Sequence, residues 1–314
     1  MNFCCVNCLY LKHATSNVFG LIFNRTTREK TVMMNTHVNP VKKRVIIAGG
    51  GTSGWLAAAA LSKIYGKNLD ISIIESDDIG RIGVGEATIP PLRTFHRLLG
   101  IDEQEFMRET QATLKLGIEF SNWGNIGDNY IHSFGVNGKD CWACDFQHFW
   151  LAGRKKGLNN DPIGAYCREL LAAKEGKAMG GDQSGVHYAY HLDAGLYAEF
   201  LKRLATKHGV KRIEGIITQV TTRPDNGFID SLDMQDGTTV SGDLFLDCTG
   251  FSGRLIHGAL NTSYEPYGHF LPCDSAVVLK ARQSPNPDHS NIPQAVVQKC
   301  GIRTVLPLDY QQVF

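Results

Sequence analysis

The sequence lacks an excess of charge of either sign, a long apolar run and a regular cysteine framework. Its 314 residues carry 32 Lys and Arg against 31 Asp and Glu, so no net field would attract nucleic acid or an anionic membrane. No apolar run approaches the roughly 20 residues that span a bilayer. Nine irregularly spaced cysteines favour a reducing compartment over a disulfide scaffold. We therefore expect a cytoplasmic protein without a membrane segment, whose function depends on a defined site.

Two pairs of cysteines nevertheless have CxxC spacing. Cys141 and Cys144 enclose Trp142 and Ala143, a spacing that fits a redox pair or half of a zinc site. No second pair follows to complete a zinc site, and no βαβ unit surrounds the motif, so the sequence favours neither function. The other pair, Cys5 and Cys8, lies in the N-terminal segment.

That N-terminal segment differs from the rest of the chain. Residues 1–33 show neither helical nor strand periodicity, and no basic region precedes their apolar pieces as in a signal peptide. The segment is poor in acidic residues, of which Glu29 is the first, and a transit peptide shares that feature. Met33 and Met34 offer an alternative start. We predict a disordered or spurious extension over 1–33 and one domain over 34–314.

A glycine-rich turn between two apolar strands is the strongest motif. Residues 45–48 are a short β-branched run typical of a buried parallel strand. GxGxxG spacing, a helix-forming run over 55–61 and a second strand over 71–74 follow, the order of a dinucleotide-binding βαβ unit. The second strand ends in an acid, 21 residues after the last glycine, which favours FAD or NAD over NADP. The candidate cofactor residues of this unit are Gly49, Gly51, Thr52, Ser53, Gly54 and Glu75.

Further along, the pattern predicts helices, a meander and a late strand. Helices are expected from Pro91, after Asp102 and after Asp193, because proline and aspartate favour helix N-termini. Residues 114–121 alternate with strand spacing, and short helices and loops are expected over 135–190. Strands near 213–220, 228–234 and 238–240 predict a β-meander, and 244–250 a buried strand that ends at glycine. We predict an α/β fold: an FAD-binding, Rossmann-like fold with three layers (ββα), of the flavin monooxygenase type.

Three blocks of sequence resemble the flavin-dependent tryptophan halogenases. They are GGGTSGW over 49–55, RIGVGEATIP over 81–90 and LKLGIEFSNW over 114–123. Shorter matches at 132–135, 191–194 and 243–250 extend the resemblance from Lys43 to about Ser275.

The resemblance implies a mechanism. Reduced FAD, delivered by a transiently bound flavin reductase, would use dioxygen to convert a halide ion into hypohalous acid. A lysine, matched here by Lys115, would then chlorinate or brominate tryptophan or another indole. The lysine would act as a haloamine or as a hydrogen-bond donor to the acid. By its spacing alone, Lys115 would lie on the wet face of an edge strand, opposite Leu114 and Leu116.

The resemblance also implies further site residues and leaves a homodimer open. Residues 79–86 would form a strap that touches both the flavin and the substrate. The implied substrate residues are Ile118, His132 and Phe134, and the implied further flavin residues are Val84, Gly85, Glu86, Ala87, Val220, Asp247 and Gly250.

One block departs from the family. The stretch aligned with the family's GWxWxIP block is residues 301–307, GIRTVLP, which lacks both tryptophans. The resemblance therefore implies a member without the family's C-terminal helical part. Two alternatives stay open: an inactive flavin-binding fragment, and a flavin-dependent aromatic hydroxylase.

Overall fold

The computed structural model describes residues 41–80, 85–175, 177, 180–181 and 184–270, and the backbone of two later strands. The expected extension over 1–33 lies outside these ranges. The chain divides into two compact units, Met1–Lys42 with Pro266–Asp274 and Lys43–Glu265 with Ser275–Phe314, and every element below belongs to the second. None of the helices in the described ranges is long and apolar enough to cross a membrane.

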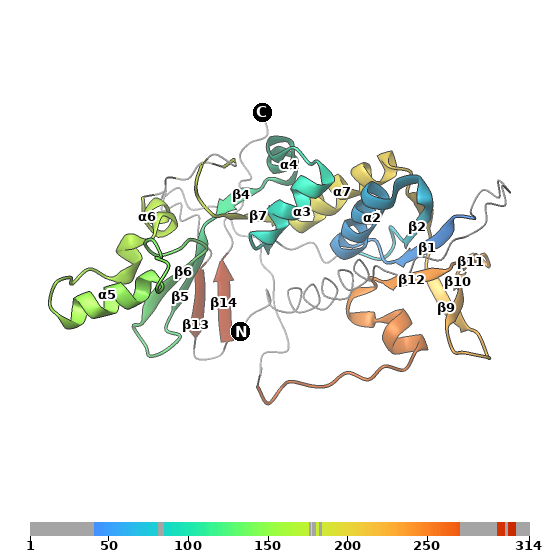
Figure 1. Cartoon of the computed structure of the whole chain (residues 1–314). Helices are drawn as coiled ribbons and strands as arrows, with labels where there is room; N and C mark the ends of the chain where they lie inside the picture. The colour runs from blue at the N-terminus through green and yellow to red at the C-terminus, as the bar shows by residue number, and fades with distance from the viewer. Residues whose placement is uncertain are drawn as a thin grey trace, which may run out of the picture. The chain divides into compact units, whose positions relative to one another are not determined.

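A four-stranded parallel sheet carries the predicted βαβ unit. Its strand order is β12-β1-β2-β8, and β1 is buried along its apolar half because its branched side chains pack on both faces. The helix α2 follows β1 directly, as the glycine motif predicts (Figure 1). The bounds are β1 Lys43–Ala48, α2 Thr52–Tyr65, β2 Leu69–Glu75, β8 Lys211–Glu214 and β12 Leu244–Asp247, with a 3-10 turn η1 at Gly66–Asn68.

The predicted meander is confirmed, but its first strand is shorter than expected. An antiparallel sheet of order β11-β10-β9 contains β9 Ile217–Thr222, β10 Ile229–Met234 and β11 Thr239–Ser241. The single strand expected over 213–220 is wrong, because β8 ends at Glu214 and joins the parallel sheet instead. Gly215, with φ of +148°, separates the two strands, a backbone conformation that favours glycine.

Three helices begin where the sequence predicts. They are α3 Pro91–Leu99, α4 Glu103–Thr110 and α7 Ala194–Lys207. Asp102 and Asp193 accept hydrogen bonds from the backbone N–H groups of Glu105 and Leu196 at the starts of α4 and α7. The helix α7 packs against α2 and α4, so these helices share one hydrophobic core with β1 and β2.

The run over 114–121 forms two strands rather than one. The strand β4, Thr113–Lys115, lies in a sheet of order β3-β7-β4, whereas β5, Gly117–Ser121, lies in a sheet of order β14-β13-β5-β6. The strand β3, at the end of the strap expected over 79–86, pairs with β7. The remaining bounds are β3 Gly85–Ala87, β6 Asn129–Ser133, β7 Ala189–Asp193, β13 Gln294–Gln298 and β14 Gly301–Val305.

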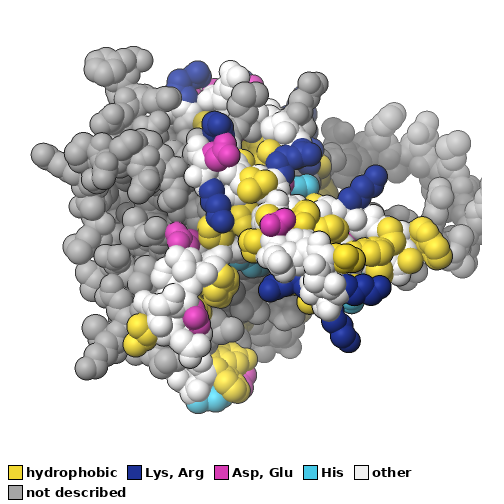
Figure 2. Space-filling model, turned by 90° about the vertical axis from the view of Figure 1, so that its left-hand side faces the viewer, with side chains coloured by type: hydrophobic (Ala, Val, Ile, Leu, Met, Phe, Trp, Pro, Cys, Tyr) yellow, Lys and Arg dark blue, Asp and Glu magenta, His cyan; other side chains and the backbone are white. Residues whose placement is uncertain are grey.

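Short helices occupy much of 135–190, as expected, and two more follow β12. On the face in Figure 2, hydrophobic side chains lie among charged ones, and Lys and Arg are more prominent there than Asp and Glu. The bounds are α5 Phe146–Lys155, η2 Ile163–Tyr166, α6 Arg168–Lys174, η3 Gly250–Ser252 and η4 Arg254–Ala259.

Candidate functional site

Lys115 ends β4 in a fully buried position. Its Nζ donates a hydrogen bond to the backbone carbonyl of Thr88 at 3.0 Å and lies 5.3 Å from the centroid of the Phe134 ring, within the range of a cation–π contact. The expectation of a wet face is therefore wrong, although β4 does lie at an edge of its sheet. Burying an amine is costly unless polar partners or an aromatic face compensate. Here Thr88 and Phe134 provide both.

The strand pair β5–β6 positions the predicted substrate residues. Ile118 pairs directly with His132, and the Phe134 N–H donates to the Leu116 carbonyl at 2.9 Å, which extends the pairing past the end of β6. Directly paired residues share one face of a sheet, and so do residues two apart in a strand. The structure thus brings Lys115 to Phe134, and Ile118 to His132. His132 is exposed, whereas Ile118 and Phe134 are half-buried.

His191 is a residue near Lys115 that the sequence did not single out. It lies on β7, paired with Ala87 on one side and Thr113 on the other, and it is fully buried. Its Nδ1 lies 3.3 Å from the Thr113 hydroxyl, while its Nε2 has no hydrogen-bond partner among the described residues. Burial, together with the charge of Lys115, lowers the pKa of His191 to about 3. The imidazole is therefore neutral beside the lysine.

The glycine turn has the geometry of a phosphate-binding loop. At Gly49, with φ of +106°, an added Cβ would lie 2.2 Å from the Cys248 carbonyl oxygen, and at Gly54 it would lie 1.9 Å from the Gly49 oxygen. At Gly51 an added Cβ would meet nothing within 4 Å. Gly49 and Gly54 thus serve tight packing, whereas Gly51 borders open space. That is the division of roles in a loop that admits a pyrophosphate.

The start of α2 continues this loop. Its N-cap is Gly51, which has no side chain to cap the first N–H groups, so these donors and the helix dipole can serve an anion. Thr52 donates from Oγ1 to the Ala194 carbonyl at 3.3 Å, and Ser53 is exposed. The loop therefore fits the phosphate end of FAD.

Glu75, the predicted ribose partner, is held by three donors. Its carboxylate accepts from Trp55 Nε1 at 3.1 Å, from Lys202 Nζ at 2.8 Å and from Arg212 Nε at 2.6 Å. Burial alone would raise the pKa of Glu75, but these hydrogen bonds outweigh it and lower the pKa to about 2. Its Oε2 would lie 1.8 Å from a Cβ on Gly50. Glu75 is therefore a charged carboxylate fixed against the glycine turn.

The sequence did not indicate these three donors. Lys202 lies 127 positions from Glu75 and Arg212 lies 137 positions from it, on α7 and β8, so no local pattern relates them. Trp55 follows the last glycine of the motif directly. Its indole N–H, which needs an acceptor when buried, was the one available signal.

The remaining predicted flavin residues lie in three places. Gly85, Glu86 and Ala87 form β3, and burial raises the pKa of Glu86; Val84 lies outside the described ranges. Gly250 follows β12 with φ of +66° and open space beside it. The other two, Val220 and Asp247, are surrounded by other parts of the fold.

Asp247 and Val220 have partners within the fold. The carboxylate of Asp247 accepts from the backbone N–H groups of Thr249, Leu255 and Ile256, so it anchors the turns after β12. Val220 lies on β9 and packs against the smaller hydrophobic cluster, which includes residues of the meander and of the parallel sheet. The structure thus gives Asp247 a role in holding the turns after β12 and Val220 a role in packing the meander.

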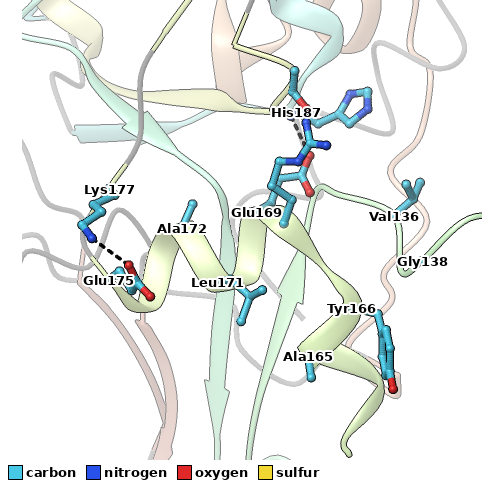
Figure 3. A pocket seen from close by; sticks show the side chains of 12 residues that line it. Val136, Gly138, Ala165, Tyr166, Glu169, Leu171, Ala172, Glu175, Lys177 and His187 are labelled. Atoms are coloured by element: carbon cyan, nitrogen blue, oxygen red, sulfur yellow. Dashed lines mark hydrogen bonds and ion pairs between the residues drawn. The ribbon is translucent and has the colours of Figure 1, made fainter.

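A cavity of about 630 Å³ lies elsewhere, beside η2 and α6. Glu169 and His187 line it, and the Glu169 carboxylate accepts from the His187 backbone N–H at 2.8 Å (Figure 3). None of the predicted site residues lines this cavity. It is therefore separate from the Lys115 site and the glycine turn.

Comparisons with known proteins agree with these features. The sequence profile described as tryptophan halogenase matches residues 44–311. Tryptophan 7-halogenase RebH of Lentzea aerocolonigenes is 36% identical over 84% of this chain and 53% of its own length. A flavin-dependent halogenase structure from Xanthomonas campestris is 48% identical with a TM-score of 0.78, over 85% of this chain and 54% of that one. A flavin-dependent halogenase structure from a Brevundimonas species is 38% identical with a TM-score of 0.79.

These matches extend over most of this chain but not over the relatives. The chain spans about half the length of the relatives it matches. Within that half, the matched range runs from β1 past β14 and includes the glycine turn, Glu75 and Lys115. The chain belongs to the tryptophan halogenase family.

Proposed function

We propose that the protein containing this chain is a flavin-dependent halogenase that chlorinates or brominates tryptophan or another indole. In this proposal the glycine turn and Glu75 hold the adenosine diphosphate half of FAD, and β3 lies along the flavin. FADH2 from a separate reductase would supply the chemistry that turns dioxygen and halide into hypohalous acid. The environment of Lys115 is the single observation that carries the proposal.

The surroundings of Lys115 keep its amine away from water and fix its orientation. Its stem is enclosed, its Nζ is oriented by the Thr88 carbonyl at 3.0 Å, and an aromatic face lies 5.3 Å away. An amine oriented in this way can donate a hydrogen bond to hypohalous acid, or carry the halogen as a haloamine. A solvated surface lysine would do neither with a fixed direction.

The neighbours of Lys115 suit an aromatic substrate. Phe134 presents a ring next to Nζ, and Ile118 and His132 lie on the same strand pair, so an indole could stack between apolar and aromatic side chains. His191 stays neutral at this site and adds no second positive charge to oppose the lysine. In this proposal Lys115 is therefore the cationic group that acts on the substrate.

Substitution of Lys115 tests the proposal. The complete coding sequence that contains this chain would be assayed with FAD, a flavin reductase, chloride or bromide, and tryptophan or indole. Lys115→Met keeps much of the buried stem, so we expect a folded protein that still consumes FADH2 and dioxygen but yields no halogenated product. The loss should exceed the roughly 10²–10⁴-fold typical of one acid–base group, because the lysine delivers the halogen itself.

A matched control is Lys67→Met on η1, an exposed lysine, which should leave the yield unchanged. Halogenation by Lys115→Met within tenfold of the wild type would refute the role of the lysine. A hydroxylated product from the wild type would instead identify a flavin-dependent hydroxylase.

A further inference from the structure

The loop between β6 and α5 presents two thiols to the solvent. Cys141 is exposed and Cys144 is half-buried, and both are free. Trp142 between them is 99% exposed, so no described side chain covers the motif from outside. The halogenase site does not use this loop, since none of its proposed residues lies between Phe134 and α5.

The chain folds back on itself between the two cysteines. The Cys141 N–H donates to the Cys144 carbonyl at 3.2 Å, and the Ala143 N–H donates to Cys141 Sγ at 3.4 Å. Each thiol also perturbs the pKa of the other, so the two side chains lie near each other in this turn. Closure of a CxxC disulfide needs such proximity.

The helix α5 fixes this turn. Asp140 accepts from the Phe146 N–H at 2.7 Å, which ties the residue before the first cysteine to the first residue of the helix. The ring of Phe146 in turn lies against Gly138, where an added Cβ would come within 2.3 Å. The thiols are thus presented by a supported loop.

The two thiols differ in acidity in the direction that a redox pair needs. The backbone N–H groups of Cys144 and Ala143 lower the pKa of Cys141, because they donate to its thiolate. Burial and the neighbouring Cys141 raise the pKa of Cys144. Since the thiolate is the nucleophile, Cys141 is the attacking sulfur and Cys144 the resolving one.

A metal site is the alternative use of a CxxC motif. A structural zinc needs four ligands, typically from two such pairs. Across the described ranges, no group of three or more His, Cys, Asp and Glu side chains is arranged to hold a metal ion. A dithiol that forms a disulfide needs no further ligand.

We propose that Cys141 and Cys144 are a peroxide-sensitive dithiol that closes reversibly to a disulfide. The Cys141 thiolate attacks one oxygen of hydrogen peroxide, so that the O–O bond breaks, hydroxide leaves and Cys141 becomes a sulfenic acid. The Cys144 thiol then attacks that sulfur, and the S–O bond breaks as water leaves. Two electrons pass from the two sulfurs to peroxide, and a dithiol reductant reverses the reaction. Reduced flavin that reacts with dioxygen without a halide is one source of peroxide.

The disulfide is tested by mapping the cysteines of the full chain before and after a brief exposure to hydrogen peroxide. We expect the 141–144 peptide to lose the mass of two hydrogens and to resist alkylation. Dithiothreitol should restore both the original mass and the reactivity of the two thiols toward alkylation. Cys167, which is buried, serves as an internal reference and should stay unmodified. Cys144→Ser should stop at a sulfenic acid on Cys141 that reacts with a dimedone probe.

The order of the two thiols is tested by alkylation rates near neutral pH. Cys141 in the Cys144→Ser variant should react several-fold faster than Cys144 in the Cys141→Ser variant. Equal rates, or a faster Cys144, would overturn the assignment of the attacking thiol. A wild-type peptide that gains oxygen on either cysteine without bridging, or that does not react at all, would overturn the disulfide.

Discussion

Alanine at Gly50 and alanine at Gly51 should have opposite effects, although the two glycines are neighbours. At Gly50 an added Cβ would lie 1.8 Å from Glu75 Oε2 and 2.4 Å from Glu75 Cβ. The carboxylate would have to move away from Trp55, Lys202 and Arg212 to make room. At Gly51, where φ is −73°, the same methyl would enter open space.

The expected magnitudes follow from what each methyl displaces. Gly50→Ala separates a buried carboxylate from its cationic partners, which typically costs about 3–5 kcal/mol of unfolding free energy. Gly51→Ala should change stability by less than about 1 kcal/mol, because the backbone conformation suits any residue and only an N-cap preference is lost. It should weaken FAD binding at least tenfold, however, because the methyl occupies the approach of the pyrophosphate. Gly51→Trp should abolish binding.

Two assays separate the effects. Urea unfolding followed by circular dichroism gives the free energy of unfolding of each apoprotein, and quenching of flavin fluorescence gives the affinity for FAD. If Gly51→Ala binds FAD as well as the wild type, the glycine turn does not hold the pyrophosphate. If Gly50→Ala is as stable as the wild type, the contact between the glycine turn and Glu75 does not matter for the fold.

Two further predictions concern acid. The pKa of Glu75 is lowered from 4.5 to about 2, so the stability from its ion pairs is complete above pH 4.5 and is lost as the pH falls towards 2. Glu75→Gln should lower the free energy of unfolding by on the order of 3 kcal/mol at pH 7 and by little at pH 2. The control Asp77→Asn, which changes an exposed partner of Arg212, should lower it by less than about 1 kcal/mol. Equal losses in the two variants at pH 7 would contradict this prediction. Burial lowers the pKa of His96 from 6.5 to about 4, so the unfolded chain binds the proton more readily, and the unfolding free energy should fall by up to about 1.4 kcal/mol per unit as the pH drops from 6.5 to 4. His96→Phe should flatten that slope in urea titrations, and an unchanged slope would assign it to other groups.

Local patterns in the sequence determined much of the fold. The βαβ unit could be predicted because its strands, glycines and helix are contiguous, although Gly49 also packs against Cys248, which is distant in the sequence. The same holds for α4 and α7, whose starts are set by Asp102 and Asp193 a few residues away. The meander could be predicted for the same reason, since its strands follow one another and pair in order.

Only the tertiary structure decided the environments of Lys115 and Glu75. Alternation placed Lys115 on a wet face, yet β4 and β5 diverge into different sheets, and Thr88 and Phe134 enclose the side chain. Glu75 reads as a strand-end acid in the sequence, but its charge is stabilised by Lys202 and Arg212, which reach it from distant parts of the chain. Periodicity predicts which face of a helix or strand a residue occupies. The burial and the pKa of its side chain depend instead on which other segments pack against that face. Those segments have no fixed separation from it in the sequence.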